Sequence, residues 1–345
     1  MVPRAKPIGF LLFALAISSL GWVAGCSRGP VVSQPAVPAQ ESQQAPSNYA
    51  GTKQVELCPI TGLACESPGV PVAVCVDNHP RATPQAGIAQ AELVYEAVTE
   101  GGITRLLAIY HCSDVPKIGP VRSTRPYFAY MAKEWDAILA HCGGLEKDVE
   151  PIQKLKVLDA NELLNPEGFW RVASRPSPHN LYTSVKSLRK RLGLESAPGE
   201  LKARWQFTPW SNKPAGGLKV EYSSKYVVDW VLDSASKSYR RMVNGAESVD
   251  ENGALVTATN VIVQTVPTRV AYPDGGVEMK LIGEGKAWFL LGGRAHTGSW
   301  KKSSPTDPTL FFDDSGKQVA LSPGRTWVQV VPTDAKIQFK DLLTK

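Results

Sequence analysis

Residues 117–128 read Lys-Ile-Gly-Pro-Val-Arg-Ser-Thr-Arg-Pro-Tyr-Phe, and the first half of the chain is organised around this stretch. The apolar run Leu106–Tyr110 precedes it and the run Ala137–Ala140 follows it, and both predict buried strands. Gly119 and Pro120 predict a turn between them. In an α/β sheet, ligands bind beyond the carboxyl ends of the strands. We therefore expect four side chains to lie together at that edge: His111, Arg122, Arg125 and His141.

Strand and helix patterns alternate through residues 55–204, which we interpret as one domain. Strands are predicted at Pro71–Val76, Thr104–His111, Ala137–His141 and Val157–Ala160. Helices are predicted at Pro84–Glu100, Pro126–Asp136 and Leu145–Leu155, with a basic helix inside Pro176–Gly193. This alternation predicts an α/β domain with a mixed or mainly parallel sheet and flanking helices.

Strand patterns dominate after residue 217. Residues 205–217 contain Pro209, Pro214 and paired glycines, and they read as a linker. Beyond it, residues 218–345 form the second predicted domain, with strands at 226–232, 238–243, 254–266, 277–282, 286–291, 294–301, 309–312, 318–321 and 327–331. The spacing predicts a β-rich sandwich or barrel.

The first 25 residues carry the pattern of an export signal. Arg4 and Lys6 precede an apolar run, Ile8–Leu20, that is too short to span a bilayer. The segment ends in Val-Ala-Gly before Cys26, which resembles the bacterial lipobox. That resemblance implies cleavage before Cys26 and acylation (palmitate) of the new N-terminus, which anchors the protein at the extracytoplasmic face of the cell membrane. An ordinary secretory signal with a chance cysteine is the alternative.

Residues 26–54 are rich in Pro, Gln, Ser and Ala and have almost no charge. Such a segment buries too little apolar surface to fold, and we interpret it as a tether. The formal net charge of the chain is +6, and loss of Arg4 and Lys6 with the leader leaves +4. This mild excess favours anionic envelope polymers weakly. Nucleic-acid binding is not expected, because it needs clustered Lys and Arg with stacking aromatics.

Five cysteines remain after the lipidation cysteine. Cys58 and Cys65 are seven residues apart around a Pro and a Gly, which suits a disulfide-closed loop in an oxidising compartment, although two free thiols are the alternative. Cys112 and Cys142 both follow predicted strands and are a possible second pair. Cys75 lies inside an apolar strand and reads as a buried hydrophobe. The cysteines have no CxxC or Cys/His spacing, so no structural metal is expected.

Arginines and histidines follow the predicted strands. Arginine forks suit phosphate or carboxylate because each binds two oxygens at once. We predict an anion or ligand site from Asp77, His79, Arg81, Arg105, Arg122, Arg125, His141 and His179. The alternative is internal pairing of these arginines with Asp77 and with Glu92, Glu96 or Glu100 in a structural ion network.

Catalytic patterns are weaker. The histidines and Asp77 could serve as acid, base or metal ligands, but they have no HxH or HExxH spacing. Ser123 lacks a GxSxG or SxxK context. Cys142 adjoins His141, but neighbouring strand residues point to opposite faces. Gly143 and Gly144 could present backbone N–H groups to an anion. The sequence identifies no cofactor.

Several motifs together resemble the YerB-like bacterial lipoprotein family. They are Pro59–Gly62, Asp77–Pro80, Glu100–Arg105, Ile118–Tyr127, His141–Gly144, His179–Tyr182, Gly298–Lys302, Asp307–Thr309 and Pro323–Trp327. The match covers nearly the whole mature chain. It implies a surface lipoprotein with an N-terminal and a C-terminal part, and it supplies no reaction, because the family is a domain of unknown function.

Two functions remain open from the sequence. The first is a non-catalytic lipoprotein that binds an anionic envelope component, such as a wall polymer or lipid phosphate, or a protein partner. The second is an envelope phosphotransferase or hydrolase, because the aspartate and arginine clusters after strands resemble the layout of LytR-CpsA-Psr transferases. A catalytic site requires Asp77 and the three arginines to converge on one accessible pocket. A binding site tolerates a shallow patch.

Overall fold

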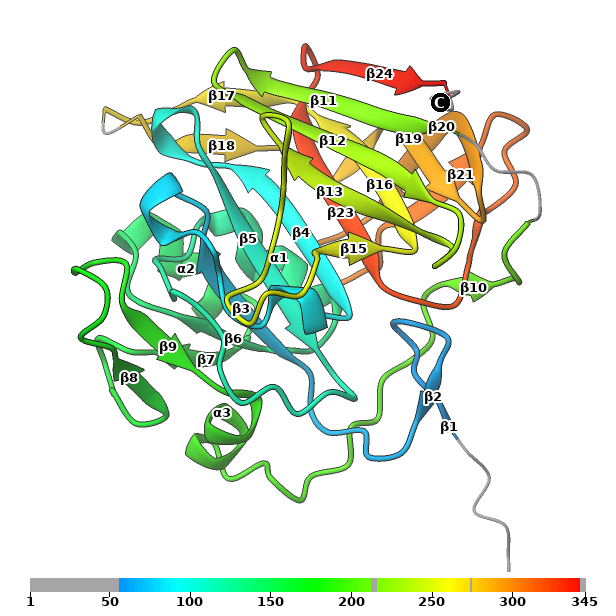
Figure 1. Ribbon diagram of the computed structural model, residues 1–345. Coiled ribbons are helices and arrows are strands. Elements are labelled where there is room, and N and C mark those ends of the chain that lie inside the picture. The colour runs from blue at the N-terminus through cyan, green and yellow to red at the C-terminus, as the bar shows by residue number, and fades with distance from the viewer. Residues whose placement is uncertain (1–55, 212–215, 274, 342–345) are drawn as a thin grey trace, which may run out of the picture. The chain divides into compact units, whose positions relative to one another are not determined.

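A computed structural model describes residues 56–211, 216–273 and 275–341 (Figure 1). Its centre is a mixed ten-stranded sheet. The strands run across that sheet in the order β21 (Leu310–Asp313), β20 (Arg294–Lys302), β19 (Gly283–Leu291), β16 (Asn260–Val266), β23 (Thr326–Pro332), β4 (Leu93–Val98), β5 (Thr104–Tyr110), β3 (Val72–Asp77), β6 (Ile138–His141) and β7 (Leu158–Asn161).

A second sheet of six strands covers part of the first. It contains β14 (Ala246–Glu247), β13 (Ser238–Val243), β12 (Tyr226–Asp233), β11 (Gly217–Ser223) and β24 (Lys336–Lys340), with β15 (Thr257–Ala258) paired to β13. Four two-stranded ribbons complete the strands: β1 (Glu56–Leu57) with β2 (Ala64–Cys65), β8 (Phe169–Arg171) with β9 (Leu181–Thr183), β10 (Gln206–Phe207) with β22 (Ala320–Leu321), and β17 (Thr268–Val270) with β18 (Val277–Met279).

The large sheet is buried on both faces. Three short α-helices lie beside it: α1 (Pro126–Glu134), α2 (Glu146–Lys154) and α3 (Val185–Arg191). On one face Phe128 of α1 packs into a core with strand residues such as Leu107. On the other face Trp230 of β12 contacts Trp327 of β23, with ring centroids 5.4 Å apart. Figure 1 shows β11, β12 and β13 lying across β16 and β23.

The prediction of a mixed sheet and a strand-rich second half is confirmed at this coarse level. Helical cover is only partial, because the three α-helices are short. The sheet also crosses from one predicted domain to the other, since β4 pairs in parallel with β23 and Val94 lies opposite Trp327. The two halves therefore share one core rather than meeting through a linker alone.

The predicted helix over Pro84–Glu100 is wrong. Only short 3₁₀ turns at Ile88–Gln90 and at Glu100–Gly102 occur there, and residues 93–98 form the central strand β4. A strand between two neighbours is buried on both faces, so it carries a near-continuous apolar run. That run mimicked the spacing of an amphipathic helix.

The predicted disulfide partners are wrong as well. Cys65 is joined to Cys112, and Cys58, Cys75 and Cys142 are free thiols. The loop at residue 58 is closed instead by backbone hydrogen bonds from Gly62 N–H to Cys58 O and from Cys58 N–H to Leu63 O, both 2.7 Å. The end of β5 brings Cys112 to β2, which distance along the chain does not reveal.

The predicted signal peptide (1–25), Cys26 and the tether (26–54) lie outside the described residues, as do residues 212–215 of the linker. Within the described part of the chain, none of the helices has the length and apolar character needed to cross a bilayer.

Candidate functional site

Strand direction decides which of the predicted residues meet. β3, β6 and β7 run parallel, so their carboxyl ends, at Asp77, His141 and Asn161, lie on the same side of the sheet. β5 runs antiparallel to β3, which places Arg105, near the start of β5, opposite Asp77 on that side. The expectation that His111 joins Arg122 is therefore wrong, because His111 follows the other end of β5.

The arginine stretch is held between the carboxyl ends of β3 and β6. Asp77 N–H donates to Pro120 O (2.8 Å), Arg122 N–H donates to Cys75 O (2.9 Å), and Cys142 N–H donates to Arg122 O (3.0 Å). Gly119 makes this passage possible: its φ is +150°, and a Cβ there would lie 2.7 Å from Leu181 O. The backbone ladder thus fixes Arg122 beside Asp77.

Asp77 lies at the centre of the site and is 1% exposed to solvent. Its Oδ2 accepts from Nδ1 of His179 at 2.7 Å and lies 3.2 Å from Nε of Arg122. Its Oδ1 accepts from the backbone N–H of His79 at 3.0 Å. Two hydrogen bonds and the nearby guanidinium charge compensate the buried carboxylate, as a buried charge requires, and the hydrogen bond to Nδ1 fixes the direction of His179.

The further contacts of His79, His179 and Arg122 determine what the site can offer to a ligand. The ring of His79 stacks on that of His179, with centroids 5.1 Å apart and planes 18° apart. Nδ1 of His79 accepts from the N–H of Arg81, so in the neutral ring the proton is on Nε2. The Arg122 side chain is 30% exposed, and its two terminal nitrogens have no partner among the described residues. The Arg122 fork and the half-buried His79 ring are therefore the groups that a ligand can reach, whereas His179 is 8% exposed.

Arg105 and Arg125 belong to a separate ion network. Glu100 accepts from Nε (3.0 Å) and Nη2 (2.6 Å) of Arg125 and lies 3.6 Å from Arg105. Asp148 lies 3.4 Å from Arg125, and Arg105 donates to Ser123 O at 2.9 Å. For these two arginines the structure favours the alternative of internal pairing.

The two remaining predicted residues, His141 and Arg81, lie in different surroundings. His141 is fully buried between Gly143 O (2.7 Å) and Asp159 (2.9 Å), so it fixes a loop and does not face a ligand. Arg81 is exposed two residues beyond His79 and adds positive charge at the rim. The site that remains contains Asp77, His79, Arg81, Arg122 and His179.

A buried charge network behind the site was not predicted. Glu96 of β4 is fully buried and pairs with Arg241 of β13 at 3.0 Å, while the Tyr226 hydroxyl donates to Glu96 at 2.6 Å. Burial acts to lower the pKa of Arg241, but the charge of Glu96 outweighs it and raises the pKa. Asn78 donates to Tyr226 and so ties the site loop to this network. The one signal in the sequence was a glutamate inside an apolar strand.

A cavity of about 350 Å³ opens beside this network. Its walls come from the loop after β3 and from β12–β14, and they include Asn78, Pro80, Gln85, Tyr226 and Arg241. Pockets of this size hold small molecules or parts of larger ligands. Because Asn78 and Pro80 flank His79 in sequence, this cavity adjoins the loop that carries His79.

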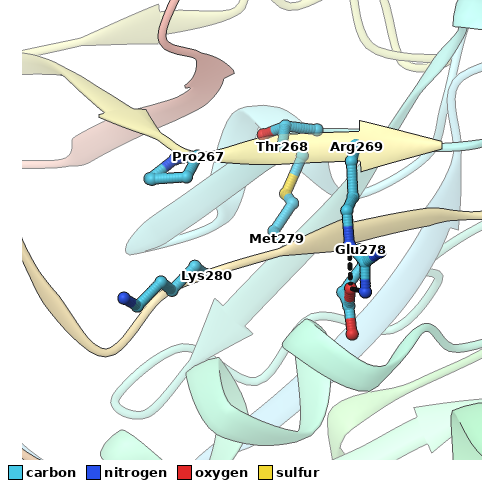
Figure 2. Close-up of a pocket in the computed structure, with 6 residues that line it drawn as sticks. All are labelled: Pro267, Thr268, Arg269, Glu278, Met279 and Lys280. Atoms are coloured by element: carbon cyan, nitrogen blue, oxygen red, sulfur yellow. Dashed lines mark hydrogen bonds and ion pairs between the residues drawn. The ribbon is translucent and has the colours of Figure 1, made fainter. Parts of the chain in front are cut away.

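Another hollow lies at the β17–β18 ribbon (Figure 2). Six residues line it, and Arg269 and Glu278 pair with each other there. Lys280 is its second cation, but no histidine is among the lining residues, so this hollow offers less chemistry than the Asp77 site.

The chain matches two family models that describe the N-terminal and C-terminal domains of a protein of unknown function (DUF3048). They cover residues 60–197 and 218–328. The chain belongs to the DUF3048 family. It is 32% identical over 292 residues to "Putative lipoprotein YerB" of Bacillus subtilis (strain 168), across 79% of this chain and 86% of that one. This confirms the YerB-like resemblance seen in the sequence.

A solved structure agrees. The crystal structure of the YerB protein from Bacillus subtilis superposes with a TM-score of 0.74, at 29% identity, and covers 82% of this chain and 99% of that one. The Asp77 site lies within the N-terminal DUF3048 domain, whereas the cavity beside it takes walls from both DUF3048 domains.

Proposed function

We propose that this DUF3048 protein is a lipid-anchored lipoprotein of the bacterial cell surface that binds an anionic group of an envelope component. The bound group is a phosphate or carboxylate, as on a wall polymer or a lipid phosphate. One observation carries the proposal: Arg122 is ion-paired with Asp77 on its Nε side (3.2 Å, without a hydrogen bond), while both terminal nitrogens of that guanidinium are unpartnered in the described structure. A guanidinium anchored in this way is oriented for two parallel hydrogen bonds to one anion.

The charges at the site set the character of this binding. Asp77 offsets the charge of Arg122, so net attraction is modest, and the directional N–H groups of Arg122 and His79 provide recognition. Arg81 at the rim adds positive charge. We expect a ligand with further contacts beyond its anionic group, because one anchored fork in partly exposed surroundings gives weak affinity alone.

The proposed anchor is lipid on Cys26, with residues 26–54 as a tether that holds the folded part near the membrane surface. A membrane-anchored protein meets lipid phosphates and wall polymers at high local concentration, and this favours a site of modest intrinsic affinity. A protein partner that presents a carboxylate is the competing occupant of the same site.

A thermal-shift experiment tests the proposal. The full chain in detergent is heated with short polyprenyl phosphates, with anionic wall polymer or with an acidic peptide, alongside Arg122→Ala and the control Arg294→Ala. Arg294 is an exposed arginine on β20, outside the site. A ligand of the native state raises the melting temperature. We expect a shift in the wild type and in the control that disappears in Arg122→Ala; equal shifts in all three proteins would contradict the proposal.

One contact favours a catalytic second candidate. Asp77 orients His179 through Nδ1 at 2.7 Å, which is the arrangement that positions an imidazole as a general base. On this candidate, His179 would activate water against a phosphate ester held by Arg122. Release of phosphate that His179→Ala abolishes, with ligand binding retained, would support it. Against it, Asp77 and the three arginines do not converge on one pocket.

A further inference from the structure

A cluster of sulfur and nitrogen ligands lies at the edge of the sheet opposite the Asp77 site. The ligand atoms of Cys65, His111 and Cys112 all lie within 4.8 Å of one another. Cys58, Glu92 and Cys112 form a second such group, so the sulfur of Cys112 is common to both. The two groups meet at Cys112, which brings three cysteines and one histidine into one region, although the spacing along the chain gave no indication of it.

The backbone around this cluster is fixed by Glu92. Its Oε2 accepts from His111 N–H at 2.8 Å, and its Oε1 accepts from Cys112 N–H and Ser113 N–H, both at 2.8 Å. The thiol of Cys58 also points to Oε2, at 3.9 Å. A carboxylate that holds ligand-bearing segments through their backbone is a typical outer-shell partner of a metal site.

The histidine is suited to ligation. Nδ1 of His111 lies 2.8 Å from Gly69 O, which orients the ring and fixes its tautomer. Because a carbonyl oxygen only accepts, Nδ1 carries the proton in the neutral ring and Nε2 is left as the ligand atom. Cys58, Cys65 and His111 are each less than 5% exposed, so water competes little for the cluster.

We infer that, once the Cys65–Cys112 bond is reduced, Cys58, Cys65, Cys112 and His111 bind a thiophilic divalent cation such as Zn²⁺. Three thiolates and one imidazole are an established donor set for tetrahedral zinc. With Zn–S bonds of about 2.3 Å, tetrahedral ligand sulfurs lie about 3.8 Å apart. Each of the two groups holds its atoms within 4.8 Å, so the bonded pair must separate and Cys58 must move toward Cys65 and His111.

The disulfide and the metal exclude each other. A dithiol reductant supplies two electrons and two protons to the Cys65–Cys112 bond, becomes a cyclic disulfide itself and leaves two thiols. Metal binding then displaces the thiol protons into solvent. The site therefore exists only in the reduced protein.

Cobalt provides the test, because Co²⁺ bound to thiolates gives intense sulfur-to-metal charge-transfer absorption and tetrahedral d–d bands. The full chain is reduced with a water-soluble phosphine, which takes oxygen from water, and is titrated with Co²⁺. We expect one equivalent to bind, Zn²⁺ to displace it, and the oxidised protein to give no such bands. Cys58→Ser and His111→Asn should each weaken binding at least tenfold.

Cys142→Ser is the matched control, since Cys142 is a free thiol outside the cluster. Wild-type absorption in this control together with loss in Cys58→Ser supports the proposal. Absence of thiolate bands in the reduced protein, or equal bands in Cys58→Ser, overturns it. If circular dichroism shows that the reduced chain is unfolded, refolding on addition of one equivalent of Zn²⁺ supports the site, and failure to refold overturns it.

Discussion

Nε of Arg122 lies 3.2 Å from Oδ2 of Asp77, and the same oxygen accepts the Nδ1–H of His179 at 2.7 Å. One buried carboxylate therefore orients both the cation and the imidazole of the proposed binding site. The relation makes Asp77 a positioning residue, which acts on a ligand through its two partners.

Asp77→Asn tests this positioning role. A neutral amide loses the charge-assisted contacts to Arg122 and His179, so we expect ligand affinity to fall at least tenfold although both of those residues remain. Titration of the ligand identified by the thermal-shift experiment measures the effect. Gln85→Ala is the control, because Gln85 donates to the main-chain Asp77 O rather than to its carboxylate. A larger loss in Gln85→Ala than in Asp77→Asn would contradict the role of the carboxylate.

The two arginines of the central stretch should behave differently in denaturation. Arg125→Ala leaves the buried Asp148 without its cation and Glu100 with only the longer contact to Arg105, and we expect it to lower the free energy of unfolding by about 2 kcal/mol. Arg122→Ala removes a partly exposed side chain, and we expect about half that loss or less. Urea unfolding of both variants gives the comparison. The assignment of Arg125 to a structural network fails if the order is reversed.

The ion pair of Glu100 with Arg125 should also make the stability of the protein depend on pH. Burial acts to raise the pKa of Glu100, but the hydrogen bond from Arg125 and the charge of Arg105 outweigh it and leave the pKa below its ordinary value. The unfolded chain then binds the extra proton as pH falls below about 4.3, so stability is lost in that window.

Glu100→Gln removes this contribution. We expect the variant to be less stable than the wild type at pH 7 and the difference to shrink as the pH falls from about 4.3 through the folded pKa. Urea titrations of both proteins at several pH values measure the difference in their free energies of unfolding. The effects of the other carboxylates cancel in this difference. A difference independent of pH would contradict the sign of the shift.

Removing only one partner of the buried Glu96–Arg241 pair should lower the free energy of unfolding strongly. Glu96→Gln leaves the Arg241 charge, which is 5% exposed, without its counter-ion, and we expect a loss of about 3–5 kcal/mol. Adding Arg241→Met should recover a large part of that loss, since no unpaired charge remains. A double-mutant cycle measures the coupling. Additive losses would mean that the two side chains do not act as a pair.

The Cys65–Cys112 bond closes a segment with a sequence separation of 47 residues. For a loop of that length the chain-entropy estimate gives a stabilisation of about 4 kcal/mol. Cys65→Ser should lower the free energy of unfolding by this order, while Cys142→Ser should have a small effect. Peptide mapping of the oxidised protein that showed Cys58 bonded to Cys65 would contradict the pairing.

The sequence predicted the strands around the arginine stretch well, because runs such as Leu106–Tyr110 are continuously apolar and end at polar residues. It failed at Pro84–Glu100, where burial on both faces gave β4 a misleading periodicity. It also placed His111 at the wrong edge, since strand direction depends on pairing partners. The pair of Glu96 with Arg241 joins residues 145 positions apart, which no local pattern reveals.

The most direct test of the central claim is calorimetric titration of the full-length protein with a short polyprenyl phosphate, in the wild type, Arg122→Ala and Arg122→Lys. A lysine keeps the positive charge but cannot form two parallel hydrogen bonds while it is held by Asp77. The account predicts measurable binding to the wild type, with affinity lowered at least tenfold in both variants. Unchanged affinity in Arg122→Ala would show that the anion binds elsewhere and would contradict the assignment of this site.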